Sequence, residues 1–190
     1  MKNMKNLKNL KFLSAALIAS SLFIGCSKDD DPQPIEEEEV ITTMTITLEP
    51  VEGGAAVTLE TRDPDADGPL PVQIQTGNLA SGVTYNGSIV LLNETEDPAE
   101  DVTIEVEMEN LLHQFFFDIS DDLDIEIYDL NLDDELELLG TSFTLTAGDV
   151  STSPGTLTIT LIHDGTKPNE VLENTDGETD IDATFEISVL

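Results

Sequence analysis

The residues Asp63, Asp65 and Asp67 have types and spacing that suit a bound calcium ion. They stand at alternate positions directly before Gly68, so three carboxylates can converge on one cation while the glycine allows a sharp turn. An EF-hand supplies a bidentate glutamate at the last position of its loop, where this chain has Ile74. A site here would need oxygens from elsewhere in the chain, and a solvated turn without metal is the alternative.

A second acidic group repeats this alternation without the glycine. It consists of Asp129, Asn131 and Asp133, with Asp134 beside them. Both groups fall between segments that we expect to be strands, where turns favour Asp, Asn and Gly for their backbone conformation alone. Calcium binding and an ordinary turn are therefore both open for each group.

His113 and His163 are the only two histidines of the chain, and together they suit a transition metal. Neutral imidazole combined with carboxylates such as those of Glu107, Glu109 or Asp164 is a typical ligand set for zinc or copper. The two histidines are distant in sequence and have no diagnostic spacing, and a histidine beside a strand is also a common packing residue. The metal hypothesis depends on whether the two side chains meet in the fold.

Cys26 is the only cysteine, and the residues around it indicate a lipoprotein signal. A lysine-rich start precedes an apolar run from Phe12 to Ile24, and Gly25 stands directly before the cysteine. The run of about 13 residues is shorter than the roughly 20 that a membrane-spanning helix needs. We expect a signal peptide at 1–25 and a lipid on Cys26, which anchors the chain to a membrane. No disulfide is expected, because there is no second thiol.

The residues behind Cys26 form an acidic segment. Ser27-Lys28-Asp29-Asp30-Asp31 resembles the export signal of surface lipoproteins of the Bacteroidota, which implies an outer-membrane protein facing the cell exterior. The prolines and glutamates that follow, up to Glu39, predict an extended and self-repelling stalk. We expect a lipidated acidic tether at 26–39 and one folded domain at 40–190.

The charge of the chain limits its partners. It has 40 Asp and Glu against seven Lys and Arg, with a formal net charge of −33, and four of those seven basic residues precede Cys26. Such a surface excludes nucleic acid as a partner and favours cations or basic protein faces. Solubility in a salty environment is an alternative reason for the charge.

Apolar and polar residues alternate with a period of two along much of the chain, as is typical of half-buried strands. The alternating segments are 44–48, 57–59, 72–74, 123–127, 157–161 and 183–189, with further apolar segments at 89–92, 115–119 and 143–145. About nine strands joined by Gly, Asp, Asn and Pro clusters predict an all-β fold, an antiparallel immunoglobulin- or fibronectin-III-like β-sandwich.

One segment supports the prediction of an immunoglobulin-like sandwich in particular. Leu79, followed six places later by Tyr85, resembles the tyrosine corner of fibronectin type III domains. That resemblance implies that the hydroxyl of Tyr85 bonds to the backbone upstream, so we expect a structural role for this residue.

The stretch 98–112 fits either a strand or a helix. Ile104, Val106 and Met108 alternate as a strand would, whereas Pro98 and the spacing of Val102 and Val106 favour a short helix or helical crossover. A short helix that leads into the strand at Gln114 is the preferred prediction.

The order of several motifs resembles that of small uncharacterised surface lipoproteins of flavobacteria and other Bacteroidota. Proteins like these are sometimes labelled as periplasmic-binding-fold proteins, although that fold alternates strands with helices and the pattern here predicts strands. The resemblance implies a surface or outer-membrane setting. The segments that carry it are Leu92–Pro98, His113–Phe116, His163 with Lys167–Asn169, and Gly177–Ile181.

These features predict a lipid-anchored, surface-exposed binding or accessory module of the outer membrane that binds Ca or Zn and works beside an uptake transporter or another envelope protein. A structural or adhesive envelope lipoprotein without a small-molecule ligand is the alternative. An enzyme is not expected, because the chain after Cys26 has no further cysteine, no Gly-rich phosphate loop and no nucleophile elbow. The many carboxylates keep a hydrolase as a third hypothesis.

Overall fold

The computed structural model describes residues 39–66 and 68–190, which form ten strands and two short helices. Cys26 and the expected signal peptide lie outside this part of the chain, as does most of the expected tether. The elements, in chain order, are β1 (Thr43–Pro50), β2 (Val57–Arg62), β3 (Gln73–Gln75), β4 (Thr84–Asn93), β5 (Glu100–Asp101), α1 (Thr103–Met108), β6 (His113–Ile119), β7 (Ile125–Tyr128), β8 (Ser142–Ala147), β9 (Gly155–His163), the 3-10 helix η1 (Leu172–Asn174) and β10 (Glu178–Ile187).

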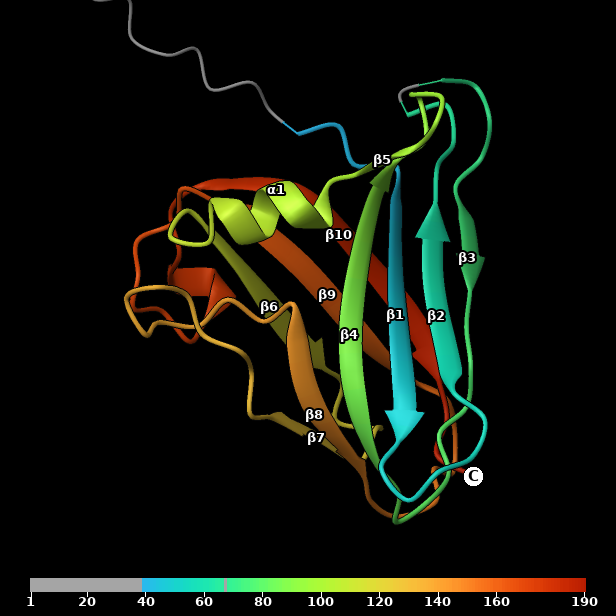
Figure 1. Ribbon diagram of the computed structural model, residues 1–190. Helices are drawn as coiled ribbons and strands as arrows, with labels where there is room; N and C mark the ends of the chain where they lie inside the picture. Colours follow the sequence, from blue (N-terminus) through green and yellow to red (C-terminus); the bar gives the residue numbers. More distant parts are fainter. Residues whose placement is uncertain (1–38, 67) are drawn as a thin grey trace, which may run out of the picture. The chain divides into compact units, whose positions relative to one another are not determined.

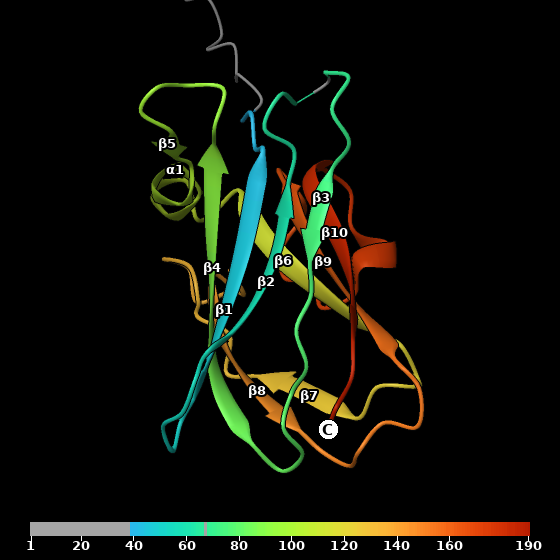
Figure 2. The same cartoon turned by 90° about the vertical axis from the view of Figure 1, so that its right-hand side faces the viewer.

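The strands form two antiparallel sheets that pack face to face (Figures 1 and 2). The larger sheet has the order β3-β2-β1-β4-β8-β7, with β5 added to the end of β4, and the smaller sheet has the order β10-β9-β6. Strand β6 is therefore an edge strand of the smaller sheet, and β7 is an edge strand of the larger one. The prediction of an all-β sandwich is confirmed.

The period-two alternation explains the core between the sheets. Met44, Ile46 and Leu48 of β1 are fully buried, and Leu157 and Phe185 face them from the smaller sheet as parts of one apolar cluster. Because successive side chains of a strand point to opposite faces, each of these strands keeps its polar residues outside.

The expected strand at 72–74 differs from this pattern. Strand β3 spans Gln73–Gln75 at the edge of the larger sheet, but Val72 and Ile74 are more than half exposed. The prediction of a half-buried strand is wrong here, because β3 is a short edge strand with all three residues exposed. Leu123 is also placed differently: it is buried but precedes β7 and is not part of it.

The contact predicted for Tyr85 is present. The backbone N–H of Ala80 donates a hydrogen bond of 2.8 Å to the hydroxyl oxygen of Tyr85, and both Leu79 and Tyr85 are buried. Tyr85 therefore closes the turn that leads into β4, as the resemblance to a tyrosine corner implied.

The ambiguous stretch 98–112 contains the short helix that we preferred. Helix α1 begins at Thr103 rather than at Pro98, and it buries Val102 and Val106 against the end of the sandwich. The helix lies at the end of the molecule where β6 starts (Figure 1). Within the described residues, no helix is long and apolar enough to cross a membrane.

Candidate metal centre

Four side chains from distant parts of the chain meet at the end of the sandwich that carries α1. They belong to Glu39, His113, His163 and Asp180, and each offers one ligand atom within 4.8 Å of the others. Among the described residues, this is the one group of three or more His, Cys, Asp or Glu side chains that is close enough to hold a metal ion.

Strand pairing brings the two histidines together. His113 begins β6 and His163 ends β9, and the two residues are direct partners in the antiparallel register. Each continues the inward-facing series of its strand, after Phe115 in β6 and after Leu161 in β9. Their ring centroids are 4.6 Å apart, so both imidazoles lie in the space between the sheets.

An irregularity in β10 accompanies the third member of the group. The register between β10 and β9 shifts between Thr179 and Ile181, so Asp180 is the extra residue of a bulge. Bulges re-aim side chains and are frequent beside functional sites. Asp180 thereby turns its carboxylate towards the histidines, whereas the other acids of β10, Glu178, Asp182 and Glu186, are exposed.

Glu39 comes from the chain just before β1 and completes the group. Its side chain is only 4% exposed, although we expected this residue to belong to a solvated stalk. That expectation is wrong for Glu39, because its two oxygens face the two histidines across the end of the sandwich.

The distances in this group match those between the ligands of a small divalent ion. Glu39 Oε1 lies 3.3 Å from His113 Nε2, and Glu39 Oε2 lies 3.4 Å from His163 Nδ1. The oxygens of Asp180 lie 3.7 and 3.9 Å from the same two nitrogens. Ligand atoms at about 2.0–2.1 Å from a tetrahedral zinc ion are about 3.3–3.4 Å apart. The two Glu39 distances equal this spacing, and the two Asp180 distances are slightly longer.

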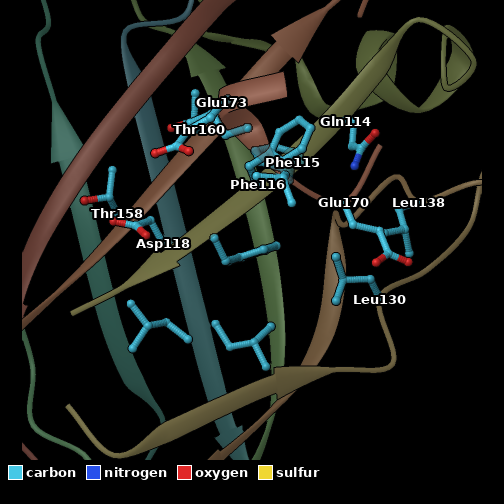
Figure 3. A pocket seen from close by; sticks show the side chains of 15 residues that line it. Gln114, Phe115, Phe116, Asp118, Leu130, Leu138, Thr158, Thr160, Glu170 and Glu173 are labelled. Atoms are coloured by element: carbon cyan, nitrogen blue, oxygen red, sulfur yellow. The ribbon is translucent and has the colours of Figure 1, made fainter. Parts of the chain in front are cut away.

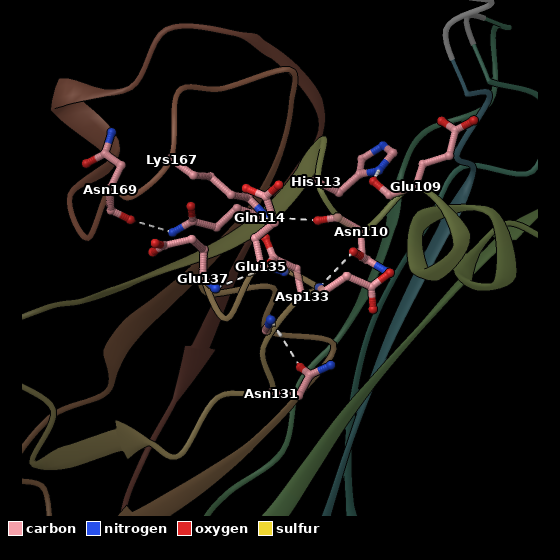
Figure 4. Close-up of polar contacts among 12 residues, drawn as sticks. Glu109, Asn110, His113, Gln114, Asn131, Asp133, Glu135, Glu137, Lys167 and Asn169 are labelled. Atoms are coloured by element: carbon pink, nitrogen blue, oxygen red, sulfur yellow. Dashed lines mark hydrogen bonds and ion pairs between the residues drawn. The ribbon is translucent and has the colours of Figure 1, made fainter.

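The backbone beside α1 orients one of the imidazoles. His113 Nδ1 lies 3.1 Å from the carbonyl oxygen of Glu109, the residue that follows the last turn of the helix (Figure 4). A carbonyl only accepts, so Nδ1 must carry the proton in this contact. The lone pair of the neutral ring is then on Nε2, which faces the two carboxylates. Metal-binding histidines are commonly oriented in this way.

The electrostatics of the group also favour a cation. Burial lowers the pKa of His113 below its ordinary value of 6.5, although the Glu109 carbonyl and the charge of Glu39 act in the opposite direction. His113 is fully buried, and its Nε2, which faces the two carboxylates, makes no hydrogen bond among the described residues. Buried polar atoms are rarely left this way. Metal ions bind imidazole in its neutral form and carboxylate in its ionised form, so two of each would supply a charge of about −2 to a bound divalent ion.

The carboxylates that the sequence suggested as partners of the histidines lie elsewhere. The side chain of Glu107 accepts a hydrogen bond from the hydroxyl of Thr141 at 3.3 Å, and Asp164 is exposed. Glu109 contributes its backbone carbonyl and is not among the four ligand side chains.

The first candidate calcium loop is only partly described, because Asp67 lies outside the described residues. Asp65 accepts a hydrogen bond of 3.2 Å from the backbone N–H of Leu70, and Ala66 has a left-handed backbone conformation with φ of 50°. These features belong to a tight turn. Calcium binding by Asp63, Asp65 and Asp67 remains a prediction.

The second candidate calcium group has protein partners for its side chains. Asn131 Oδ1 accepts the backbone N–H groups of Gly140 and Ser142 at 3.1 and 2.9 Å. Asp133 accepts two backbone N–H groups and the ammonium group of Lys167, while Asp129 is exposed. Asn131 and Asp133 thus close loops, as the turn alternative expects, and calcium binding by Asp129, Asn131 and Asp133 remains a prediction.

Sequence reasoning found the two histidines but missed Glu39 and Asp180. A signal for the histidines was available, because each occupies the next inward position of an apolar alternation. Glu39 is the last member of a run of four glutamates, and nothing in the run distinguishes it. Asp180 depends on a bulge that alternation does not reveal.

Comparison with known proteins does not assign the centre to a known group. No protein-family model matches the chain, no curated protein matches it, and no solved structure matches it. The geometry of the described residues is therefore the basis for the function of this chain.

Proposed function

We propose that this protein is a lipid-anchored envelope module, facing the cell exterior, that binds one zinc ion through Glu39, His113, His163 and Asp180. The observation that carries the proposal is the pair of buried imidazoles, one of them oriented by the Glu109 carbonyl, facing two carboxylates at 3.3–3.9 Å. The anchored setting rests on Cys26 and the acidic residues behind it.

The mixture of nitrogen and oxygen ligands supports zinc over calcium. Calcium takes six to eight ligands that are all oxygens, whereas zinc accepts imidazole and carboxylate together in a four-coordinate site. The net negative charge of the domain raises the local concentration of cations and would assist capture.

The burial of the site supports a structural role for the bound zinc ion. His113 is fully buried, and the side chains of His163, Glu39 and Asp180 are 11%, 4% and 5% exposed. Four protein ligands in a closed pocket are typical of structural zinc, whereas catalytic zinc keeps one position open. A bound ion would join β6, β9 and β10 to the segment before β1, and so link the two sheets.

Calorimetry tests the zinc proposal on the chain from residue 26 with Cys26→Ser, after treatment with a chelator. We expect one zinc ion per chain and a clear rise in the unfolding temperature, since zinc at about 100 times its Kd adds about 2.7 kcal/mol of stability. The double variant His113→Gln and His163→Gln should lose both effects. Asp164→Asn, an exposed acid beside His163, is the matched control and should keep them. Absence of zinc binding by the unsubstituted chain would refute the proposal.

The location is tested separately on intact cells. A protease added outside the cells should remove the protein if it faces the exterior. Protection until the outer membrane is broken would place the protein inside, without bearing on zinc.

A further inference from the structure

A cavity of about 670 Å³ lies along the open edge of β6 and is lined by six consecutive residues of this strand, Gln114 to Ile119. Figure 3 shows Phe115 and Phe116 in its centre, with Asp118, Thr158, Thr160 and Glu173 on one side and Leu130, Leu138 and Glu170 on the other. The cavity therefore receives side chains from both faces of β6. A ligand that lay along this strand would contact both faces in turn.

The backbone of β6 has free hydrogen-bonding groups on this side. Phe115 N–H points away from β9 and donates to the carbonyl of Leu139, whereas Ser120 N–H donates to Thr156 at the start of β9. In an antiparallel strand, the backbone N–H groups of successive residues point alternately to one side of the strand and to the other. The N–H groups of Phe117 and Ile119 therefore point away from β9, as that of Phe115 does. Among the described residues, no backbone carbonyl pairs with either of them.

The two sheets differ in their number of strands, and β6 is an edge strand of the narrower sheet. The smaller sheet has three strands and faces a sheet of seven. Ile127 at the edge strand β7, together with Leu130, lines the cavity and is only half-buried. A fourth strand beside β6 would pair with the free N–H groups and cover this part of the larger sheet. An open edge of this kind is a template for strand addition.

The rim of the cavity is negatively charged, which favours a ligand with basic groups. Asp118, Glu170 and Glu173 line it and are exposed, and none of the described residues that line it is a lysine or arginine. Apolar residues form much of the remaining wall. Apolar side chains of a bound segment would pack against this wall, while its basic side chains would reach the three carboxylates.

We propose that the β6 edge binds an extended segment of a partner protein in which apolar residues alternate with lysine or arginine. The segment adds as a fourth strand to the smaller sheet. Its apolar residues occupy the cavity beside Ile127 and Leu130, and its basic residues pair with Asp118, Glu170 and Glu173. A second copy of this chain is a poor occupant, because its own surface is strongly acidic.

The probe for this site is a short synthetic peptide that alternates valine and lysine, with both ends blocked. Two further peptides serve as controls: one alternates valine and glutamate, and the other alternates glycine and lysine. Binding to the full chain is measured by fluorescence anisotropy, and hydrogen exchange is followed at the amides of Phe117 and Ile119. We expect the valine–lysine peptide alone to bind and to slow exchange at these two amides.

Surface variants test whether the peptide binds at the β6 edge. The double variant Glu170→Lys and Glu173→Lys changes exposed residues and should weaken the valine–lysine peptide by about tenfold or more. The matched double variant Glu49→Lys and Glu186→Lys changes exposed acids on other strands and should have a much smaller effect. Equal binding of the glycine–lysine peptide, or unchanged exchange at Phe117 and Ile119, would overturn the proposal. Dimerisation of the chain that blocks the peptide would also overturn it, in favour of a second copy.

Discussion

Two buried clusters in the described part of the chain bring acidic and basic side chains together, and they differ in the hydrogen bonds that their buried atoms make. In one, Asp133 accepts backbone N–H groups of Glu135 and Glu137 at 2.9 Å each and the ammonium group of Lys167 at 2.8 Å. In the other, the proposed zinc centre, the facing Nε2 of His113 makes no hydrogen bond among the described residues.

The paired cluster holds loops in place. Lys167 also donates to the carbonyl of Asn110 at 2.8 Å, and the side chain of Gln114 donates to the carbonyl of Asn169 at 2.6 Å, so the loop after β9 is tied to the start of β6 (Figure 4). Burial alone would raise the pKa of Asp133, but the hydrogen bonds from Lys167 and from the two amides outweigh it and lower the pKa. No further ligand is needed to stabilise this carboxylate.

The proposed zinc centre, in contrast, has a buried ring nitrogen, His113 Nε2, that is available to a ligand. A cluster that served only the fold would be expected to pair its buried groups, as the cluster around Asp133 does. The two clusters therefore differ at their buried polar atoms: those of Asp133 are fully used by the protein, whereas His113 Nε2 has no hydrogen-bond partner among the described residues.

The largest effect on stability should come from breaking the paired cluster. Lys167→Met leaves the carboxylate of Asp133 buried without its cation, so we expect the free energy of unfolding to fall by about 3 kcal/mol. Zinc affinity should be unchanged, because no ligand side chain is altered. Chemical denaturation and calorimetry on the same variant measure the two quantities. A large loss of zinc affinity at unchanged stability would reverse the roles assigned to the two clusters.

A substitution in the proposed zinc centre should have the opposite effect, a loss of zinc affinity with little change in stability. Glu39→Gln removes one anionic ligand, and we expect the Kd for zinc to rise by about 100-fold, at least as much as the loss of an outer-shell contact. Without metal, stability should change little, because Glu39 Oε2 makes no hydrogen bond among the described residues. Asp133→Asn is the matched acid-to-amide control, and it should lower stability while keeping zinc affinity. Similar behaviour of the two variants would remove the distinction.

The pH dependence of stability should report the buried imidazole. The lowered pKa of His113 means that, between this value and the ordinary value of 6.5, the unfolded chain binds more protons than the folded chain. Stability of the metal-free protein should therefore be greatest above pH 6.5 and fall as the pH decreases below it, by at most about 1.4 kcal/mol per pH unit for one proton.

Denaturation at several pH values, with a chelator present, measures this slope. The groups that face His113 are Glu39, Asp180, His163 and the Glu109 carbonyl, so the informative quantity is the difference between the original chain and His113→Gln. The variant should have a shallower slope between the two pKa values. Identical slopes would mean that the imidazole titrates as it does in the unfolded chain.

The comparison also explains how much the sequence could predict. Period-two alternation identified the strands that supply the core, because a strand between two sheets must place every second side chain inside. It could not distinguish β3, whose pattern is the same but whose edge position leaves Ile74 exposed. Alternation records which residues share a face, and not whether another sheet covers that face.

The candidate site was predictable in part for a similar reason. His113 and His163 continue inward-facing series, so their burial follows from the pattern. Asp180 becomes a neighbour of both through a register shift, and Glu39 through the path of the chain before β1. Both depend on tertiary geometry, which is why Glu107, Glu109 and Asp164 were equally reasonable partners from the sequence.

The smallest effect should come from a third acid–cation pair, which lies at the surface. Arg62 Nε donates to both oxygens of Glu94 at 2.8 and 2.9 Å, and the pKa of Glu94 is lowered by this contact and by the hydroxyl of Thr43. The geometry is as good as that of Lys167 and Asp133, but the Arg62 side chain is 37% exposed and that of Lys167 is 9% exposed. Water and salt screen exposed pairs.

Arg62→Met should therefore lower stability several-fold less than Lys167→Met, and the loss should shrink further at high salt in chemical denaturation. An equal loss in the two variants would show that contact geometry, and not burial, sets the stability that these pairs contribute.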